Sequence, residues 1–350
     1  MELAAGVFVV VLVGTALART LADARAAVAA ATGATAGAAG ETGAARGPAA
    51  GGRAPALSVL KPVRGADDFT EAALASWCEQ DYDGPIQVLF CLQDEADPAL
   101  PIARRVADRT RQEVRVGPVA AGWSGKMSNL RHGLAAARHD TLVLSDGDIR
   151  AAPDTCARIA GALAEADLVS CLPLFTGARG LWARLYEGLW TYVILGFVAP
   201  TIRWRGRGAI GGTLALRRET LERLGGLEPF RDFVAEDVAI GRRAAELGLR
   251  ARLGPAVDAP VGRLGARDLA GRFARAALLG DTLSPVEANL RFAALFAWLP
   301  VLLAGAILAS GPLLASAAAL LALRVGAAAG LARISSQPPR LPWEAPLGDL

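Results

Sequence analysis

Short apolar runs alternate with amphipathic segments along the first half of this 350-residue chain. The runs predict strands at 57–60, 86–92, 114–116 and from 142, and the segments between them predict helices at 69–79, 99–108 and 126–137. Strands alternating with helices indicate an α/β domain with a largely parallel sheet and helices on both faces. Ligands of such sheets bind at the carboxyl ends of the strands, so the loops there are where we expect chemistry.

The N-terminal apolar run covers residues 3–18. As a helix it would be about 24 Å long, slightly short for a bilayer core. Glu2 precedes the run, whereas Arg19 and Arg25 follow it. This is the reverse of a secretory signal, the alternative reading, and the positive-inside rule puts the following domain in the cytoplasm. We therefore predict a membrane anchor at 1–19 and an Ala/Gly-rich linker at 20–56. The first half of this linker is compatible with a helix at the membrane, and residues 33–52 are typical of a flexible tether.

A second apolar region near the C-terminus has no charged residue between Arg291 and Arg324. A turn at 310–312 would divide it, so we predict a hairpin of membrane helices at 288–333, a tail at 334–350 and the catalytic domain at 57–287. The second arm is marginal, because Arg324 costs about 2.5–3.5 kcal/mol and cancels the gain from its leucines. That arm must pack against other helices, or Arg324 must reach the membrane surface.

Composition agrees with a membrane protein. Hydrophobic residues make up 53% of the chain, and the mean hydropathy is +0.34. Lys and Arg (37) nearly balance Asp and Glu (34), which gives no argument for nucleic-acid binding. The four cysteines form no CxxC pair and are expected to be reduced core residues. The chain has only two histidines, so the sequence gives little support for a Ser-His-Asp triad or a metal site made of several histidines.

The candidate chemistry is concentrated in the segment 141–150, TLVLSDGDIR. A buried strand ends here in Asp146-Gly147-Asp148. In extended chain the two carboxylates project to the same side, and the glycine lets a ligand approach the backbone. A hard divalent cation carrying phosphate oxygens would suit them. The alternative is a solvated turn, since turns favour these residues.

Two other strand ends carry candidate residues. Asp94 follows the strand at 86–92, whereas Asp97 precedes a proline and is expected to cap a helix. Lys126 and Asn129 lie one turn apart at the start of the helix at 126–137. A helix N-terminus attracts anions, and Lys126 would add a positive charge, although a solvated lysine looks the same in sequence.

The second half of the chain supplies another pair of acids. The segment 209–218, AIGGTLALRR, predicts a strand after a glycine pair. Glu236 and Asp237 then open a helix. Acids in a first helical turn gain about 0.3–1 kcal/mol from the helix dipole without doing any chemistry, so the pair has a purely structural alternative.

The order of these motifs resembles that of inverting glycosyltransferases of families 2 and 21, in particular the ceramide glucosyltransferase-like branch and its bacterial, hopanoid-associated members. The matching segments are KPVRG at 61–65, QDY at 80–82, LFCLQDEADPA at 89–99, GKMSNL at 125–130, SDGDIR at 145–150, RR-x5-LGGL at 217–227 and AED at 235–237. The resemblance covers roughly two thirds of the chain.

The resemblance implies a GT-A fold, a UDP-sugar donor, a Mg²⁺ or Mn²⁺ ion, a membrane lipid acceptor and a location in the bacterial inner membrane. It assigns Asp94 to the nucleoside, Lys126 and Asn129 to the donor, Asp146 and Asp148 to the metal and diphosphate, and Asp237 to the catalytic base. The chemistry fits these roles, because a cation neutralises the departing diphosphate and a carboxylate takes the acceptor's proton.

The chain departs from the family at one motif. The family carries Q/R-x-x-R-W on a helix near the membrane, and the best match here is Arg272-x-x-Arg275 followed by Ala276. The two arginines are assigned to the diphosphate, but the tryptophan is missing. Two alternative functions therefore stay open: a catalytically impaired membrane scaffold, and a metal-dependent phosphoryl or nucleotidyl transferase that also uses Asp-x-Asp.

The segment 181–200 mixes aromatic and aliphatic residues. Trp182, Tyr186, Trp190 and Tyr192 would form an interfacial belt, or the segment would be a buried helix that covers the sheet. Three arginines at 203–207 follow and suit anionic head groups, as they would a solvated turn.

Overall fold

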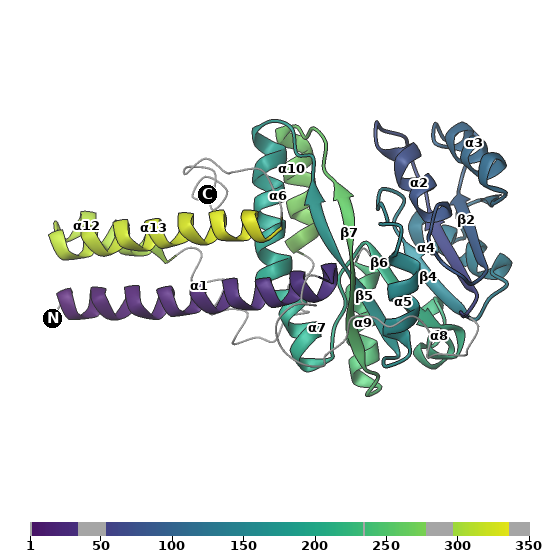
Figure 1. Cartoon of the computed structure of the whole chain (residues 1–350). Coiled ribbons are helices and arrows are strands. Elements are labelled where there is room, and N and C mark those ends of the chain that lie inside the picture. The colour runs from purple at the N-terminus through teal and green to yellow at the C-terminus, as the bar shows by residue number, and fades with distance from the viewer. Residues whose placement is uncertain (1, 34–53, 234, 278–296, 336–350) are drawn as a thin grey trace.

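The computed structural model describes residues 2–33, 54–233, 235–277 and 297–335 (Figure 1). Within these residues a seven-stranded sheet has the order β3-β2-β1-β4-β6-β5-β7. The strands are β1 Leu57–Pro62, β2 Ile86–Leu92, β3 Glu113–Val116, β4 Thr141–Ser145, β5 Leu168–Thr176, β6 Thr213–Arg217 and β7 Ala251–Pro260. β6 is antiparallel to β4 and β5, and the other neighbours are parallel. The predicted α/β fold with a mostly parallel sheet is confirmed.

Helices cover both faces of the sheet. They are α2 Thr70–Cys78, α3 Leu100–Thr110, α4 Gly125–Ala136, α5 Thr155–Leu163, α8 Arg218–Leu224 and α9 Glu236–Glu246. Along β1, Val59 packs in the core under α2, α3 and α5, and Leu60 packs on the opposite side with α4, α8 and α9. Cys91, Cys156 and Cys171 are buried free thiols, as the sequence predicts for core cysteines.

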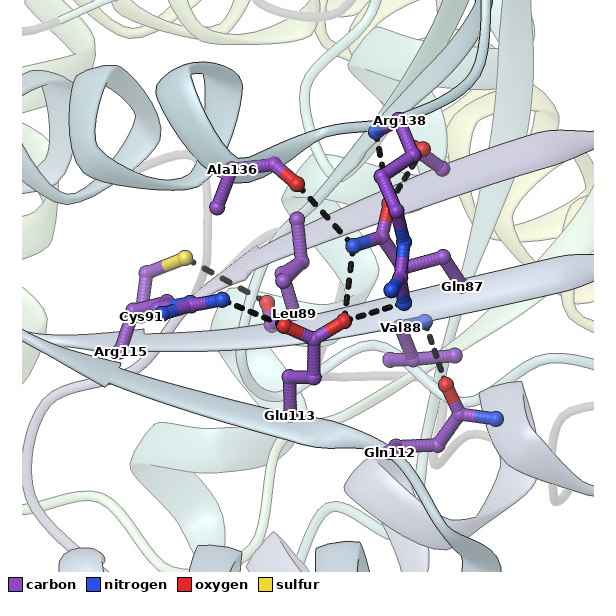
Figure 2. Close-up of polar contacts among 10 residues, drawn as sticks. Gln87, Val88, Leu89, Cys91, Gln112, Glu113, Arg115, Ala136 and Arg138 are labelled. Atoms are coloured by element: carbon purple, nitrogen blue, oxygen red, sulfur yellow. Dashed lines mark hydrogen bonds and ion pairs between the residues drawn. The ribbon is translucent and has the colours of Figure 1, made fainter.

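A buried glutamine joins three strands at the edge where they begin (Figure 2). Gln87 Nε2 donates to Glu113 Oε1 (2.9 Å) and to the carbonyl of Ala136 (3.0 Å). Gln87 Oε1 accepts from Ser58 Oγ (2.8 Å) and from the amide of Arg138 (2.9 Å). The amide of Gln87 thus uses both of its donors and two acceptor positions within the protein, so it has no group left for a ligand. The amino ends of these strands are therefore structural, and a site is expected at their carboxyl ends.

The N-terminal helix continues past the predicted anchor into the first half of the expected linker. Helix α1 spans Glu2–Thr32, so residues 20–32, which the sequence analysis assigned to the linker, are helical. Alanine has the highest helix propensity, and Ala24, Ala27 and Ala31 are fully buried against the catalytic domain. Arg158 Nη2 from α5 donates to the carbonyls of Ala30 and Ala31 and so satisfies the helix end. Residues 34–53 of the expected linker lie outside the described residues.

The C-terminal hairpin consists of α12 Trp298–Ile307 and α13 Gly311–Ile334 in the described part of the chain. Ser310 Oγ accepts from the amide of Leu313 (3.4 Å) at the predicted turn. Arg324 is 4% exposed, and its guanidinium lies 5.2 Å from the centre of the Tyr192 ring. The second arm is therefore one continuous helix whose arginine packs against protein. The expected boundary at 287/288 and residues 336–350 of the tail lie outside the described residues.

A helical layer packs between the sheet and α13, and α1 contacts both this layer and the strands β5 and β7. The layer comprises α6 Leu181–Val193, the π-helix Ile194–Val198 and α7 Ala199–Arg205, and α10 Ala266–Ala277 packs against α6. The aromatic residues of α6 do not all have the same environment. Trp182 is 42% exposed, as an interfacial residue would be, whereas Tyr192 is 1% exposed, as in a buried helix. In the part of the chain that the structure describes, three helical segments are long and apolar enough to cross a membrane: Val7–Thr32, Leu181–Arg205 and Gly311–Ile334.

Candidate active site

The acid pair predicted from the sequence lies at the carboxyl end of β4. The amide of Asp146 donates to the carbonyl of Gly212 (2.8 Å), which joins the turn to the start of β6. A Cβ on Gly147 would come within 2.9 Å of the Pro62 carbonyl oxygen, so only glycine lets the turn pack this closely on the end of β1. Asp148 reaches solvent, whereas Asp146 is partly buried.

Lys126 joins the two halves of the site. Its Nζ lies 2.5 Å from Asp146 Oδ1 and also pairs with Glu236 Oε1. Helix α4 brings the lysine here through its first turn, which Ser124 caps by accepting from the amide of Met127 (3.3 Å). Burial opposes the charge of Lys126, but the carboxylates of Asp146 and Glu236 outweigh it and raise the pKa of the ammonium above its usual value. Lys126 is therefore a cation held in place by two carboxylates.

Asp237 enters from the start of α9. The glycine pair before β6 makes room for it, since a Cβ on Gly211 would meet Asp237 Oδ2 at 2.9 Å. Burial, and then the neighbouring Glu236 carboxylate, raise the pKa of Asp237 to about 7. A carboxyl with such a pKa exchanges its proton readily near neutral pH, as a general base must.

One pocket holds these groups together. It is lined by Pro62, Lys126, Leu130, Leu144, Ser145, Asp146, Gly212, Thr213, Leu214, Glu236, Asp237 and Ile240. The ammonium of Lys126, the carboxylates of Asp146 and Glu236 and the carboxyl of Asp237, whose pKa is raised, thus face the same space, whereas Asp148 is not among the lining residues. Leu130, Leu144 and Ile240 give that space an apolar wall, which strengthens the electrostatic interactions inside it.

The carboxylates fit a divalent cation that is completed by other oxygens. Within the residues that the structure describes, no group of three or more His, Cys, Asp or Glu side chains is arranged to hold a metal by itself. Shielding from water, and then the nearby Asp146 carboxylate, raise the pKa of Asp148, although its side chain still reaches solvent. A cation between the two acids would relieve this repulsion. Mg²⁺ typically binds through one or two carboxylates plus phosphate oxygens and water, which matches what the turn offers.

Lys61 was not predicted as a site residue. Its side chain holds the backbone of the turn that contains Asp146 and Asp148. Lys61 is fully buried at the end of β1, and its Nζ donates to the carbonyls of Asp146 (2.6 Å) and Ile149 (3.1 Å). The ammonium lies 5.4 Å from the centre of the Trp77 ring. Burial lowers the pKa of Lys61 to about 7, against the opposing effect of Asp148 and Asp146. A lysine inside an otherwise apolar strand was the available signal.

Glu236 was also missed as a partner of Lys126. It is adjacent to Asp237 in sequence, and it is 6% exposed. The sequence presents the two acids as equivalent residues of a first helical turn. Only the structure shows that Glu236 pairs with Lys126 whereas Asp237 faces Gly211. Their roles therefore differ.

The remaining predicted site residues are not among those that line this pocket. Asp94 is exposed after β2, and its Oδ1 accepts from the amide of Ala96 (2.9 Å). Asn129 is 2% exposed, and its Nδ2 donates to the carbonyl of Val63 (3.4 Å), so it supports the loop after β1. The Arg272 guanidinium lies 4.8 Å from the centre of the Tyr186 ring on α6. Arg275 lies on the same helix, α10, but its side chain is outside the described part of the structure.

Asp97 is structural, as predicted, but it is not the N-cap of α3, because that helix begins at Leu100 and its N-cap residue is Ala99. Both of its carboxylate oxygens accept from the amide of Gly65, at 3.0 and 3.1 Å, and its Oδ1 also accepts from the amide of Ala99 (2.8 Å). The side chain thus links the start of α3 to the loop after β1. It is one reason why the strand ends around the site keep their positions.

The mostly parallel sheet, with acids where β4 ends, defines a GT-A type α/β fold. The fold is similar to that of a mannosyltransferase from Pyrobaculum calidifontis, solved in complex with GDP-Man and Mn²⁺, with a TM-score of 0.50 and 20% identity over 93% of this chain and 87% of that one. The sequence profile of glycosyl transferase family 21 matches residues 18–349. Because this match covers nearly the whole chain, the protein belongs to glycosyl transferase family 21, as its motifs predict.

Two relatives are similar over shorter regions. Ceramide glucosyltransferase 1 of Caenorhabditis elegans is 22% identical over 209 residues, which are 56% of this chain and 43% of that protein. The ceramide glucosyltransferase of Candida albicans is 23% identical over 107 residues, 27% of this chain and 20% of that protein. The chain therefore matches less than half the length of either relative.

Proposed function

We propose that this protein is a membrane-bound inverting glycosyltransferase. It transfers glucose or N-acetylglucosamine from a UDP-sugar to a hydroxyl of a lipid, such as a ceramide or hopanoid tetrol, at the cytoplasmic face of the bacterial inner membrane. The observation that carries this proposal is that Asp146, Lys126 and Asp237 line one pocket. Family membership supports sugar transfer, and the names of the two relatives support a lipid acceptor and glucose.

The donor side of the reaction requires positive charge. When UDP leaves the anomeric carbon, negative charge develops on the diphosphate. Lys126 supplies a permanent cation at that position, and Asp146 and Asp148 would hold Mg²⁺ or Mn²⁺, as expected from the resemblance. When bound, this ion would neutralise phosphate charge. Lys126 already has two carboxylate partners, so a diphosphate would displace or share an existing ion pair.

The acceptor side requires a base. As the lipid hydroxyl oxygen attacks the anomeric carbon, Asp237 accepts the hydroxyl proton, and the bond to the UDP oxygen breaks with its electron pair on UDP. A single displacement of this kind inverts the anomeric configuration. The Glu236 carboxylate is already paired with Lys126, so Asp237 is the acid that is left to take the proton.

The activity should depend on pH through Asp237. Only the ionised carboxylate accepts a proton, and its pKa is raised to about 7. We expect kcat/KM to rise about tenfold per pH unit below neutrality and to level off above it. Initial rates of UDP release measured from about pH 5.5 to about pH 9 check this. A profile that is flat across neutrality would contradict a base with this pKa.

Replacing Lys61 should weaken the metal site without touching it directly. Lys61→Met keeps the length of the side chain but removes the charged donor to the carbonyls of Asp146 and Ile149. Each carbonyl then keeps one weaker partner, the Ile149 amide for Asp146 and Trp77 Nε1 for Ile149. Outer residues that orient metal ligands typically contribute 10–100-fold to affinity, so we expect about that loss of Mn²⁺ affinity in the presence of UDP. Titration followed by electron paramagnetic resonance measures it.

Ser58→Ala is the matched control for Lys61→Met. Ser58 is buried on the same strand, and its hydroxyl donates to Gln87 Oε1. We expect this variant to lower the free energy of unfolding by about 1 kcal/mol and to leave Mn²⁺ affinity unchanged. Equal losses of Mn²⁺ affinity in both variants would show that Lys61 contributes only general stability.

The proposed reaction is tested with membranes that contain the full chain. They are incubated with labelled UDP-glucose and, separately, with UDP-N-acetylglucosamine, and the lipid extract is analysed by mass spectrometry. We expect UDP and one new glycolipid from one of the donors. Release of pyrophosphate or a phosphorylated lipid would favour a phosphoryl or nucleotidyl transferase, and absence of turnover would favour a scaffold.

A further inference from the structure

The layer formed by α6, the π-helix Ile194–Val198 and α7 crosses the direction of α1 and α13 (Figure 1). α1 contacts the π-helix and α7, and α13 contacts α6. On its other side the layer packs against β5 and β7. If α1 and α13 span a bilayer, this layer lies at the membrane surface, parallel to it.

The two ends of the layer carry the same kind of exposed residues. The start cluster consists of Arg179, Leu181, Trp182, Arg263 and Arg267, all exposed. The segments come together because the amide of Arg179 donates to the carbonyl of Gly262 (2.8 Å). The end cluster consists of Arg203, Trp204, Arg205 and Arg207, also exposed. The Arg203 guanidinium lies 4.9 Å from the centre of the Trp204 ring.

This composition is that of a membrane interface. Tryptophan concentrates at the level of lipid head groups, and each arginine near an anionic membrane surface contributes attraction. Asp268 is the one acid in the sequence of α10, and its carboxylate accepts from the amide of Gly265 (2.9 Å). The three arginines of the start cluster therefore outnumber it. The layer has 25 residues, so its two ends lie about 37 Å apart if it is straight. Two contacts at that separation would fix the tilt of the catalytic domain.

We propose that the α6–α7 layer rests on the membrane surface and that the start cluster and the end cluster bind anionic phospholipid head groups at its two ends. The apolar character of Leu181–Arg205 then serves to cover the sheet and contact the bilayer, and this segment does not cross the membrane although its length and composition would allow it. Its inner residues Leu185, Tyr192 and Ile202 are buried in the protein, as this placement requires.

Cysteine accessibility tests the placement. Trp182→Cys and Trp204→Cys are made singly in the full chain, and an impermeant maleimide is applied to intact cells and to inverted membrane vesicles, with the labelling of the native cysteines subtracted. We expect both positions to react from the same side of the membrane. Leu308→Cys, which is 61% exposed at the turn between α12 and α13, should react from the opposite side. Reaction of positions 182 and 204 from opposite sides would overturn the proposal.

Lipid preference tests the head-group contacts. The full chain is reconstituted into bilayers that contain brominated phosphatidylglycerol or brominated phosphatidylcholine, and tryptophan quenching is measured. Subtracting the signal of Trp204→Phe isolates the end cluster. We expect stronger quenching by phosphatidylglycerol and a loss of about fivefold or more in this preference for Arg203→Gln/Arg207→Gln. Arg203→Lys/Arg207→Lys should keep the preference. Equal quenching by both lipids, or no effect of the glutamine variant, would contradict the proposal.

Discussion

Asp237→Asn is expected to lower kcat by about 10²–10⁴-fold, because the asparagine amide cannot accept the proton of the acceptor hydroxyl. The change preserves shape next to Gly211, and it removes a carboxyl that does not pair with Lys126. We therefore expect UDP-sugar binding to change little. Initial rates of UDP release and binding of UDP by titration calorimetry separate the two effects.

Asp232→Asn is a suitable control for this variant. Asp232 is an exposed acid five residues earlier in the same region, and it does not line the pocket. Its replacement should leave both rate and binding unchanged. An Asp237→Asn variant as active as the parent would remove Asp237 from the role of base, and a variant that loses UDP binding instead would assign it to the donor.

Replacing both Asp146 and Asp148 should lower kcat/KM about as much as Asp237→Asn lowers kcat, because it weakens both donor binding and catalysis. For Asp146→Asn/Asp148→Asn we expect a loss of at least about 10²-fold in kcat/KM, because the charge that develops on UDP loses its counter-charge. Lys126 also loses the partner 2.5 Å from its ammonium. The direct readout is Mn²⁺ binding in the presence of UDP, which should fall with activity.

Asp154→Asn provides the comparison for the acid pair. Asp154 is an exposed acid shortly after the same turn, and it makes no side-chain cap contact at the start of α5. It should not change Mn²⁺ affinity. Full Mn²⁺ binding by the double variant would mean that these two carboxylates are not the ligands.

The sequence predicted the parts of the fold whose signal is local. β2 and β4 are short, mostly apolar runs that end in polar residues, and both appear as predicted. β7 was missed, since Gly254 and Pro255 interrupt it. That glycine is required by packing, because a Cβ there would come within 2.6 Å of Val169. Contacts between distant segments of this kind leave no periodic pattern in the sequence.

The site residues show the same difference between local sequence signals and contacts between distant segments. Asp146, Lys126 and Asp237 were found because each belongs to a recognisable motif at a strand or helix end, and the structure brings them to one pocket. Glu236 and Lys61 were missed because their roles depend on partners far away in sequence: Lys126 for the first and the carbonyls after β4 for the second. A residue's type and neighbours do not reveal such partners.

The first helix has a consequence for how the protein is made. Ala24, Ala27 and Ala31 belong to the core, and Arg158 donates to the last carbonyls of α1. The C-terminal half of α1 is therefore a structural part of the enzyme. We therefore expect the core of the sheet domain to be complete only when this part of α1 is present. Cutting the chain after residue 56 would yield a fragment with an uncovered apolar groove, prone to aggregate, in place of a water-soluble enzyme.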